Sequence, residues 1–189
     1  KADLLVYQPD VLVLIDFPGF NLKIAEFAKE KGIKVCYYIS PKVWAWNQKR
    51  VLKIKKIVDH MFCILPFEVA FYKGWGMEVD YVGNPLLDEI SSFTPNAKFS
   101  TQNQLTDQPI IALLPGSRKQ EIKSALPVFA QLAVENPEVN FIVAGISEWK
   151  ELYTNYPIQV LYDQTYDILS HAHAAVVTSG TATLETALF

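Results

Sequence analysis

Cysteine is scarce in this sequence, which has only two, Cys36 and Cys63, in 189 residues. Each lies inside an apolar run, where an unpaired cysteine usually acts as a small core side chain. Disulfides belong mainly to oxidising compartments, whereas isolated thiols in apolar surroundings are typical of a reducing one. We therefore expect both thiols to be free.

An excess of positive charge is also missing, because 17 Lys and Arg stand against 20 Asp and Glu and the net charge is −3. A protein that binds nucleic acid over a broad surface needs a basic footprint. Any contact with a polyanion must therefore be local, and we expect no nucleic-acid partner.

Long apolar runs are missing too, since none approaches the roughly 20 residues that span a bilayer, and there is no signal-peptide pattern. The sequence therefore predicts a cytoplasmic protein. It does not begin with Met, and residues 183–189 look like a helix that stops without a capping residue or a glycine. We interpret it as a piece of a longer protein.

Half of the residues are hydrophobic, enough for the core of one large or two small domains. Short, nearly continuous apolar runs, typical of strands buried on both faces, alternate with amphipathic stretches such as residues 21–31. We expect strands at residues 11–15, 34–39, 60–65, 109–114, 139–144 and 174–177, with further helices at about 122–134 and after 178. This order predicts right-handed βαβ units and parallel sheets with helices on both sides.

A polar stretch, residues 91–108, interrupts this pattern and is flanked by prolines. It predicts a linker, with room for a short helix, between a domain at residues 1–90 and a domain at residues 109–189. Two doubly wound domains joined in this way are expected to face a cleft with the carboxyl ends of their strands.

The stretch LLPGSR, residues 113–118, follows an apolar run and opens a helix. Gly116 would let backbone N–H groups approach an anion, and Ser117 and Arg118 would add side-chain donors. The alternative is an ordinary turn in which Ser117 caps the helix. Glu121 lies within helical contact of Arg118 and would hold its guanidinium in place.

The stretch TSGTATLE, residues 178–185, has the same position relative to the last apolar run. Its small and hydroxyl side chains at a helix N-terminus suit a diphosphate. Glu185 is either an acid that complements the helix dipole or an acceptor for two neighbouring sugar hydroxyls. Two such turns and one carboxylate together indicate a nucleoside diphosphate sugar.

Two carboxylates follow predicted strands. Asp16 ends the first strand, where a general base would point into the cleft, although a turn-capping role explains it equally well. Glu68 lies just past the strand at 60–65 and is also explained as a first-turn helix acid. The histidines complete no coordination set, so no metal site is expected.

The stretch SPKVWAWNQKR, residues 40–50, places Trp44 and Trp46 ahead of a basic segment. We expect an amphipathic helix after Asn47. Its apolar side would carry Val51, Ile54, Val58 and Met61, and its basic side would carry Lys49, Lys53 and Lys56. A solvated surface helix explains the lysines but not the two indoles. Indoles and basic residues together favour the boundary between membrane and water, with RNA binding as a minor alternative.

These motifs occur in an order that resembles the lipid-A-disaccharide synthase family. They are DFPGFN at 16–21, SPKVWAWNQKR at 40–50, LPFE at 65–68 with FY at 71–72, VGNP at 82–85, LLPGSR at 113–118 and SGTATLE at 179–185. The resemblance covers nearly the whole chain. It implies a GT-B-type fold of two Rossmann-like domains, truncated at both ends.

The resemblance also implies a reaction, an inverting transfer without metal or other cofactor from UDP-2,3-diacylglucosamine to 2,3-diacylglucosamine 1-phosphate. Asp16 is implied as the base, with Glu68 as the other candidate. The implied donor side comprises Gly116, Ser117, Arg118, Glu121, Ser179, Gly180, Thr181, Ala182, Thr183 and Glu185. The implied acceptor or membrane side, at the surface lipids of the inner membrane, comprises Asn21, Trp44, Trp46, Lys49, Arg50 and Asn84.

Two positions depart from the family pattern. Gly19 occupies the place of a second Asp, which strengthens the case for Asp16, and Asn84 occupies the place of a His, which weakens a role in proton transfer there. Two rival interpretations remain: a sugar-nucleotide epimerase of the same fold, and a non-catalytic module that binds a UDP-sugar.

Overall fold

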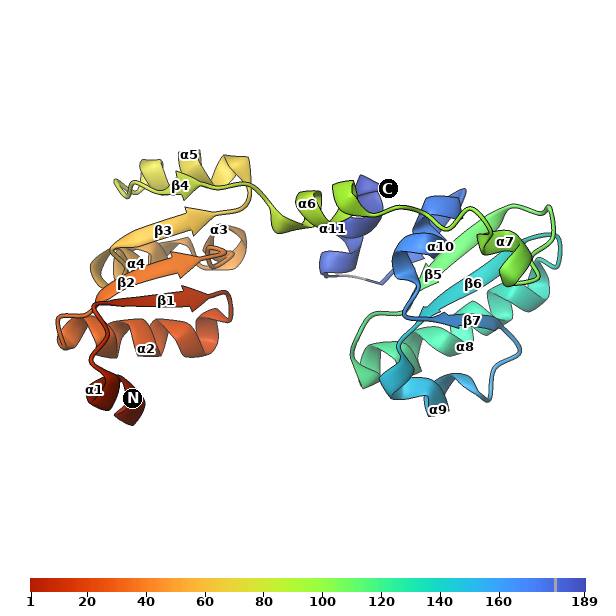
Figure 1. Cartoon of the computed structure of the whole chain (residues 1–189), viewed down its shortest axis with the longest axis horizontal. Helices are drawn as coiled ribbons and strands as arrows, with labels where there is room; N and C mark the ends of the chain where they lie inside the picture. The colour runs from red at the N-terminus through yellow and green to blue at the C-terminus, as the bar shows by residue number, and fades with distance from the viewer. Residues whose placement is uncertain (179) are drawn as a thin grey trace. The chain divides into compact units, whose positions relative to one another are not determined.

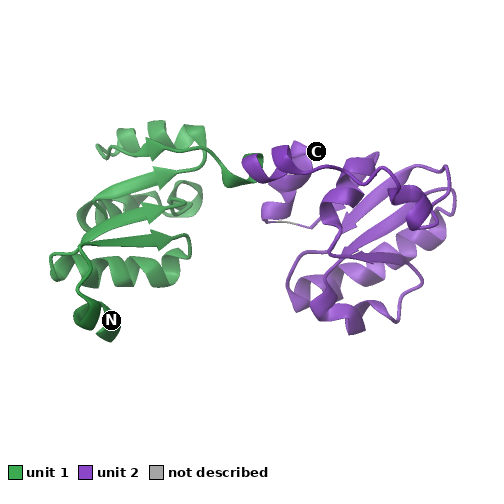
Figure 2. Cartoon of the chain, viewed as in Figure 1, with its two compact units in different colours: residues 1–87 green, residues 88–189 purple. Residues whose placement is uncertain are grey.

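The computed structural model describes residues 1–178 and 180–189. The chain forms two compact units, residues 1–87 and residues 88–189, which Figure 2 distinguishes by colour. We call them unit 1 and unit 2 and describe each by itself.

Unit 1 contains a four-stranded parallel sheet in the order β1-β2-β3-β4 (Figure 1). Its helices connect successive strands, as right-handed crossovers require. In chain order the elements are α1 (Ala2–Tyr7), β1 (Val11–Ile15), α2 (Pro18–Glu30), β2 (Lys34–Tyr38), α3 (Val43–Trp46), a 3₁₀ helix (Gln48–Arg50), α4 (Val51–Ile57), β3 (His60–Cys63), α5 (Pro66–Gly74), β4 (Asp80–Tyr81) and α6 (Pro85–Ser92), which crosses the boundary between the units.

The core of unit 1 forms where α2 and α4 pack near β1 and β2. Leu22, Ala25 and Ala28 recur every third position of α2 and are buried, as a single apolar stripe predicts. Val35 and Tyr37 are fully buried in β2. Both cysteines are free, as expected.

One expectation about β1 is wrong. The apolar run was expected to be buried on both faces, yet Val11, Val13 and Ile15 are exposed, at 45%, 59% and 59%. These three residues alternate along the strand and therefore share one face of the sheet. Only the opposite face of β1, which carries Leu14, is buried against the core.

The expected amphipathic helix is also shorter than its apolar pattern suggested. Helix α4 ends at Ile57, and Val58 already has an extended backbone. Met61 is buried because it lies in β3, not because it continues the helical stripe. A strand that follows a helix closely can thus extend the apolar pattern of that helix.

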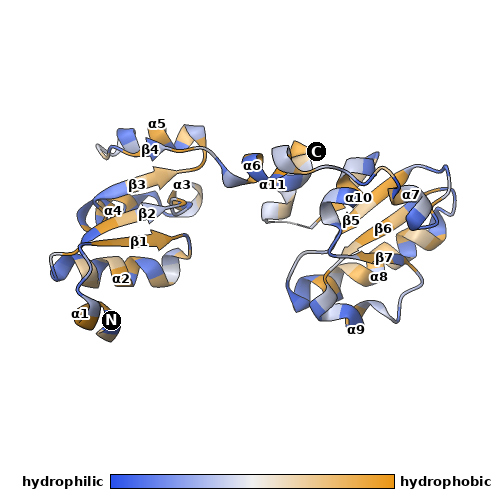
Figure 3. Cartoon of the chain, in the orientation of Figure 1, coloured by the Kyte–Doolittle hydropathy of each residue, from blue (hydrophilic) through white to orange (hydrophobic). Residues whose placement is uncertain are grey.

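Unit 2 contains a second four-stranded parallel sheet, in the order β7-β6-β5-β8 (Figure 1). Its elements are α7 (Phe99–Gln102), β5 (Ile110–Leu114), α8 (Lys119–Glu135), β6 (Asn140–Gly145), a 3₁₀ helix (Ser147–Trp149), α9 (Lys150–Tyr153), β7 (Gln159–Tyr162), α10 (Thr165–His171), β8 (Ala174–Val177) and α11 (Thr181–Leu188). Strands β5 and β6 are strongly apolar (Figure 3). Alternate residues of β5 belong to different clusters, Leu113 packing with Ile122 and Leu126 of α8, and Ala112 with Ile168 of α10. The expected α/β class with two parallel sheets is confirmed.

The stretch predicted as a linker, residues 91–108, lies entirely within unit 2. Phe99 of α7 is fully buried in the core beside Ile110 and Ile168. The backbone N–H of Asn96 donates to Oδ1 of Asp167 across 2.7 Å. The stretch is polar in composition, yet its single buried aromatic residue, Phe99, packs it against the sheet.

Candidate functional site

The sheet of unit 2 brings the two predicted anion-binding turns to neighbouring strand ends. Strands β5 and β8 are paired in parallel with Leu114 opposite Val177. The N–H of Thr178 donates to the carbonyl of Leu114 across 3.2 Å. A pocket of about 380 Å³ is lined by the start of α8, including Glu121, together with Thr178. The turns that follow these strands therefore leave the sheet at the same edge.

The first turn is closed on itself by Glu121. Oε2 of this residue accepts the backbone N–H groups of Ser117, at 3.2 Å, and Arg118, at 3.1 Å. Oε1 accepts from Nη1 of Arg118 across 2.7 Å. A carboxylate therefore occupies the donors that were predicted to hold a phosphate, and the predicted pairing of Glu121 with Arg118 is present.

The cap of α8 differs from the alternative in which Ser117 caps the helix. Helix α8 begins at Lys119, so Arg118 is the N-cap residue and Glu121 provides the capping carboxylate. Gly116 has φ +97°, and a Cβ there would lie 2.5 Å from Oε2 of Glu121. Only glycine therefore fits this turn without strain.

Electrostatics keep the Glu121 carboxyl ionised. The side-chain hydrogen bond from Arg118 lowers its pKa most, and backbone N–H groups lower it further. Arg118 itself is 81% exposed, so its guanidinium remains open to solvent on the side away from Glu121.

The second turn opens α11. Gly180 has φ +84° and precedes the helix, and Oγ1 of Thr183 donates to its carbonyl across 2.7 Å. Thr181 is exposed, whereas Ala182 packs partly against the core. Ser179, which was predicted to belong to this site, lies outside the described residues.

Glu185 is half-buried in α11. Burial raises the pKa of the Tyr166 hydroxyl, and the carboxylates of Glu185 and Glu89 raise it further. The Glu185 carboxylate thus lies near a phenol as well as near the second turn. Its binding to a sugar diol stays a prediction.

The carboxyl end of β1 in unit 1 has an uncommon backbone. Asp16 and Phe17 both have left-handed conformations, with φ 45° and 44°. Nδ2 of Asn21 donates to the carbonyls of Ile15, at 3.0 Å, and Asp16, at 2.8 Å. The Tyr37 hydroxyl donates to the carbonyl of Asp16 across 2.5 Å. Two consecutive non-glycine residues in this region cost free energy, and these bonds hold the turn in place.

This turn opens onto a pocket of about 260 Å³, which we call the Asp16 pocket. Its lining residues are Asp16, Pro18, Pro41, Lys42, Val43, Trp46 and Arg50. The structure therefore brings together three predicted site residues, Asp16, Trp46 and Arg50. Lys49 is exposed and does not line the pocket.

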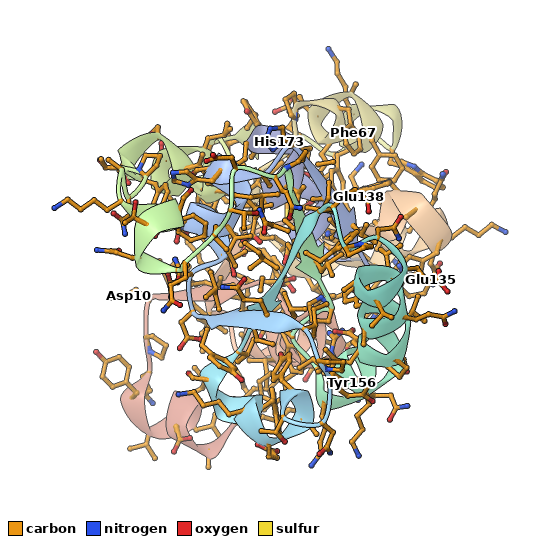
Figure 4. All side chains as sticks on the ribbon, turned by 90° about the vertical axis from the view of Figure 1, so that its right-hand side faces the viewer. Asp10, Phe67, Glu135, Glu138, Tyr156 and His173 are labelled. Atoms are coloured by element: carbon orange, nitrogen blue, oxygen red, sulfur yellow. The ribbon has the colours of Figure 1, made fainter. Side chains whose placement is uncertain are left out.

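Glu68, the second predicted carboxylate, is 1% exposed. Its Oε1 accepts from Oγ of Ser40, at 2.5 Å, and from Nε1 of Trp44, at 3.2 Å. Its Oε2 accepts the N–H of Leu65 across 3.1 Å. Glu68 therefore connects α3 to the start of α5. The rings of Trp44 and Phe67 pack in a T-shaped arrangement with 4.9 Å between centroids (Phe67 is labelled in Figure 4).

Asn84 is buried ahead of α6, and its Oδ1 accepts the N–H of Leu86 across 3.1 Å. The contact is typical of a turn-forming asparagine. An acceptor-side role for Asn84 stays a prediction.

Sequence reasoning did not identify two residues of the site, Lys42 and Tyr37. Lys42 is a charged residue two positions before Trp44, and this proximity could have identified it as a site residue. Tyr37 gives none, because its apolar neighbours in β2 make it look like an ordinary core residue.

The histidines have structural contacts. Nδ1 of His173 accepts the N–H of Ile110 across 3.2 Å (His173 is labelled in Figure 4). The His171 ring stacks on Phe99 with 4.7 Å between centroids. In the described part of the chain, no three His, Cys, Asp or Glu side chains are grouped as metal ligands. No helix within residues 1–178 and 180–189 is both long and apolar enough to cross a membrane.

Solved structures support the fold. UDP-GlcNAc 2-epimerase from Neisseria meningitidis, bound to UDP-GlcNAc, matches with a TM-score of 0.59 at 13% identity over 95% of this chain and 57% of that one. The Methanocaldococcus jannaschii UDP-GlcNAc 2-epimerase, in complex with UDP-GlcNAc and UDP, matches with a TM-score of 0.62 at 17% identity over 97% of this chain and 59% of that one. At these identities the likeness concerns the fold alone.

Sequence relatives are more specific. The lipid-A-disaccharide synthase of Trichlorobacter lovleyi is 41% identical over 100% of this chain and 52% of the relative. That of Nitrosococcus oceani is 42% identical over 96% of this chain and 50% of the relative. The chain thus spans about half the length of these curated relatives. The family model for lipid-A-disaccharide synthetase matches residues 1–189. The chain belongs to the lipid-A-disaccharide synthase family.

Proposed function

We propose that the chain forms part of an enzyme that transfers diacylglucosamine from UDP-2,3-diacylglucosamine to 2,3-diacylglucosamine 1-phosphate. The products are lipid A disaccharide 1-phosphate and UDP. The observation that carries the proposal is the family match over all 189 residues. The two glycine turns at neighbouring strand ends and the carboxylate at the end of β1 supply the required chemistry.

Unit 2 binds the donor in this proposal. The turns at Gly116 and Gly180 place the diphosphate at the positive ends of α8 and α11, and the diphosphate displaces the Glu121 carboxylate from the N–H groups of Ser117 and Arg118. Arg118, whose guanidinium is largely exposed, stabilises the charge that builds on the departing UDP. Glu185 accepts hydrogen bonds from the ribose hydroxyls. The two UDP-GlcNAc 2-epimerases of similar fold contain bound UDP-GlcNAc in their solved structures.

Unit 1 binds the acceptor, and Asp16 acts as the general base. The Asp16 carboxylate takes the proton of the acceptor hydroxyl as the hydroxyl oxygen bonds to the anomeric carbon of the donor. The bond from that carbon to the β-phosphate oxygen breaks on the opposite face and the electron pair leaves with UDP. The configuration at the anomeric carbon is therefore inverted.

Exposure favours Asp16 over Glu68 as the base. The Asp16 side chain lines an open pocket, whereas Glu68 is buried with both oxygens already bonded to donors. A base must lie within hydrogen-bond reach of its substrate proton. Glu68, at 1% exposed, acts in this proposal by positioning α3 through its bond to Trp44.

We also propose that the enzyme acts at the cytoplasmic surface of the inner membrane as a peripheral protein. Trp46 is 70% exposed, and Lys49, Lys53, Lys55 and Lys56 are exposed on the adjoining helical segments. Indoles prefer the interface between hydrocarbon and water, and basic residues attract anionic lipid headgroups. Substrates with acyl chains require such a location.

Product analysis of the full-length enzyme tests this proposal. Labelled UDP-2,3-diacylglucosamine is incubated with and without 2,3-diacylglucosamine 1-phosphate, and the products are separated by chromatography. We expect disaccharide and free UDP in equal amounts, only when the acceptor is present. An isomerised UDP-sugar formed without acceptor would show an epimerase instead, and unchanged donor in both reactions would refute catalysis.

A further inference from the structure

We infer that the Asp16 pocket binds the headgroup of a sugar phosphate, with the phosphate on Arg50 and Lys42 and the sugar ring against Trp46. This inference rests on the proposed function, because it assigns the acceptor of that reaction to particular side chains. It adds the ligand chemistry of this pocket and a role for Lys42.

Charge in the pocket is unpaired, although both signs are present. Asp16 and Arg50 line the same cavity without forming an ion pair, and Lys42 forms none either within residues 1–87, all of which the structure describes. Both charges act on the buried phenol of Tyr37, since Asp16 raises its pKa and Arg50 lowers it, after the larger effect of burial. Two cations and one carboxylate are therefore left for a ligand.

Mixed charge selects for a ligand with two kinds of polar group. A bare phosphate is attracted by Arg50 and Lys42 but repelled by Asp16. A neutral sugar donates hydroxyl hydrogen bonds to Asp16 but leaves both cations without a partner. A sugar phosphate satisfies all three groups, because its hydroxyls face the carboxylate and its phosphate faces the cations.

Trp44 and Trp46 have different roles beside the Asp16 pocket. Trp44 is fixed by its hydrogen bond to Glu68 and its edge contact with Phe67, so it anchors the short helix α3. Trp46, two residues later, lines the pocket and keeps 70% of its surface exposed. Its indole is free to cover the apolar face of a sugar ring, as amphipathic aromatic side chains do.

The size of the pocket limits what enters. Its volume of about 260 Å³ is below the roughly 300–1,000 Å³ of pockets that enclose drug-sized ligands. A single sugar with its phosphate is of suitable size, whereas long acyl chains are not. The acyl chains of an acceptor would therefore lie outside the Asp16 pocket.

NMR titration of the ¹⁵N-labelled chain tests this inference. The probes are glucosamine 1-phosphate, glucosamine, inorganic phosphate and glycerol 3-phosphate, the last representing a phospholipid headgroup. We expect the indole signal of Trp46 and the amides of residues 16–21 and 41–50 to shift with glucosamine 1-phosphate. Glucosamine and inorganic phosphate are each expected to bind at least about tenfold more weakly, since each lacks one set of charge-assisted hydrogen bonds. Glycerol 3-phosphate is expected to bind about tenfold more weakly as well, since it has no sugar ring for Trp46 to cover.

Matched variants identify the phosphate ligand. Arg50→Gln is expected to weaken glucosamine 1-phosphate binding about tenfold, and Arg50→Lys to weaken it less, because lysine keeps the charge without the planar fork. Lys73→Gln removes one exposed charge from α5 and should leave binding unchanged. Wild-type chemical shifts elsewhere in each variant verify its fold.

Several results would overturn the inference: no shifts with glucosamine 1-phosphate, equal affinity for inorganic phosphate or glycerol 3-phosphate, or unchanged affinity in Arg50→Gln. A UDP titration of the same sample keeps the donor proposal separate. Shifts at residues 113–121 with UDP, but none in unit 1 with the sugar phosphate, would refute this inference alone. The converse result would refute the donor site alone.

Discussion

The indole Nε1–H of Trp44 donates to Oε1 of Glu68 across 3.2 Å, and this bond joins α3 to the first turn of α5. Ser40 donates to the same oxygen and the N–H of Leu65 to the other, so three donors converge on one buried carboxylate. The wall of the Asp16 pocket that carries Trp46 depends on this group.

We expect Glu68→Ala to lower the free energy of unfolding of unit 1 by about 3–5 kcal/mol, because three buried donors lose their acceptor at about 1–3 kcal/mol each. Glu68→Gln keeps one carbonyl acceptor and should cost about 1–2 kcal/mol. Urea unfolding followed by tryptophan fluorescence measures this, since Trp44, Trp46 and Trp75 lie in unit 1 and Trp149 in unit 2. Wild-type stability in Glu68→Ala would contradict the positioning role.

The Glu121 carboxylate occupies the N–H donors of the first glycine turn, so it competes with a diphosphate for them. We therefore expect Glu121→Gln to bind UDP several-fold more tightly, because a neutral amide neither repels the ligand nor holds Arg118 as strongly. Isothermal titration calorimetry measures the affinity. Glu135→Gln, at the other end of α8, is the matched control (Glu135 is labelled in Figure 4). Weaker binding by Glu121→Gln would mean that this carboxylate supports the turn instead.

The two tryptophans should differ in membrane binding. Trp46 is largely exposed, so Trp46→Ser should reduce co-sedimentation of the full-length protein with anionic vesicles while leaving the fold intact. Trp44→Phe loses the bond to Glu68 and should lower stability with little effect on vesicle binding once the protein is folded. Equal vesicle binding by wild type and Trp46→Ser, at low and at moderate salt, would remove Trp46 from the membrane interface.

Asp59 should give unit 1 part of its sensitivity to acid. The hydrogen bond from Lys29 lowers the pKa of this carboxyl below its ordinary value of 3.8, and the N–H of Val35 lowers it further. The unfolded chain therefore binds the proton more readily, and stability decreases as the pH falls below about 4 towards the folded-state pKa. Asp59→Asn should show a shallower decrease over that window in urea unfolding at a series of pH values. Parallel curves for the two proteins would contradict this assignment.

Much of the fold could be predicted because parallel strands are apolar throughout. The runs at β5 and β6 were located within one residue of their observed starts. Strands β4 and β7 were not predicted, since β4 has two residues and β7 is a half-buried edge strand. The exposure of Val13 could not be predicted either, because composition does not reveal which face of a sheet is covered.

The candidate site was predictable where a single turn carries the signal. Local sequence predicts a glycine with positive φ at Gly116, and it places Asp16 at the end of a strand. The partners of Asp16 are different, because Lys42, Trp46 and Arg50 reach the pocket through contacts between distant segments. The hydrogen bonds from the first turn to Glu121 could not be predicted either, because the Glu121 side chain could equally have pointed to solvent.

Turnover by Asp16→Asn in the full-length enzyme decides whether Asp16 is the general base. Asp10→Asn is the matched control, because Asp10 is an exposed carboxylate just before β1, at the other end of the strand from Asp16 (Asp10 is labelled in Figure 4). We predict that kcat for disaccharide formation falls about 10²–10⁴-fold in Asp16→Asn, with a smaller rise in KM for the acceptor because an amide oxygen accepts the sugar hydroxyl more weakly than a carboxylate, and that Asp10→Asn behaves as wild type. Near-normal kcat in a folded Asp16→Asn enzyme would exclude Asp16 as the general base.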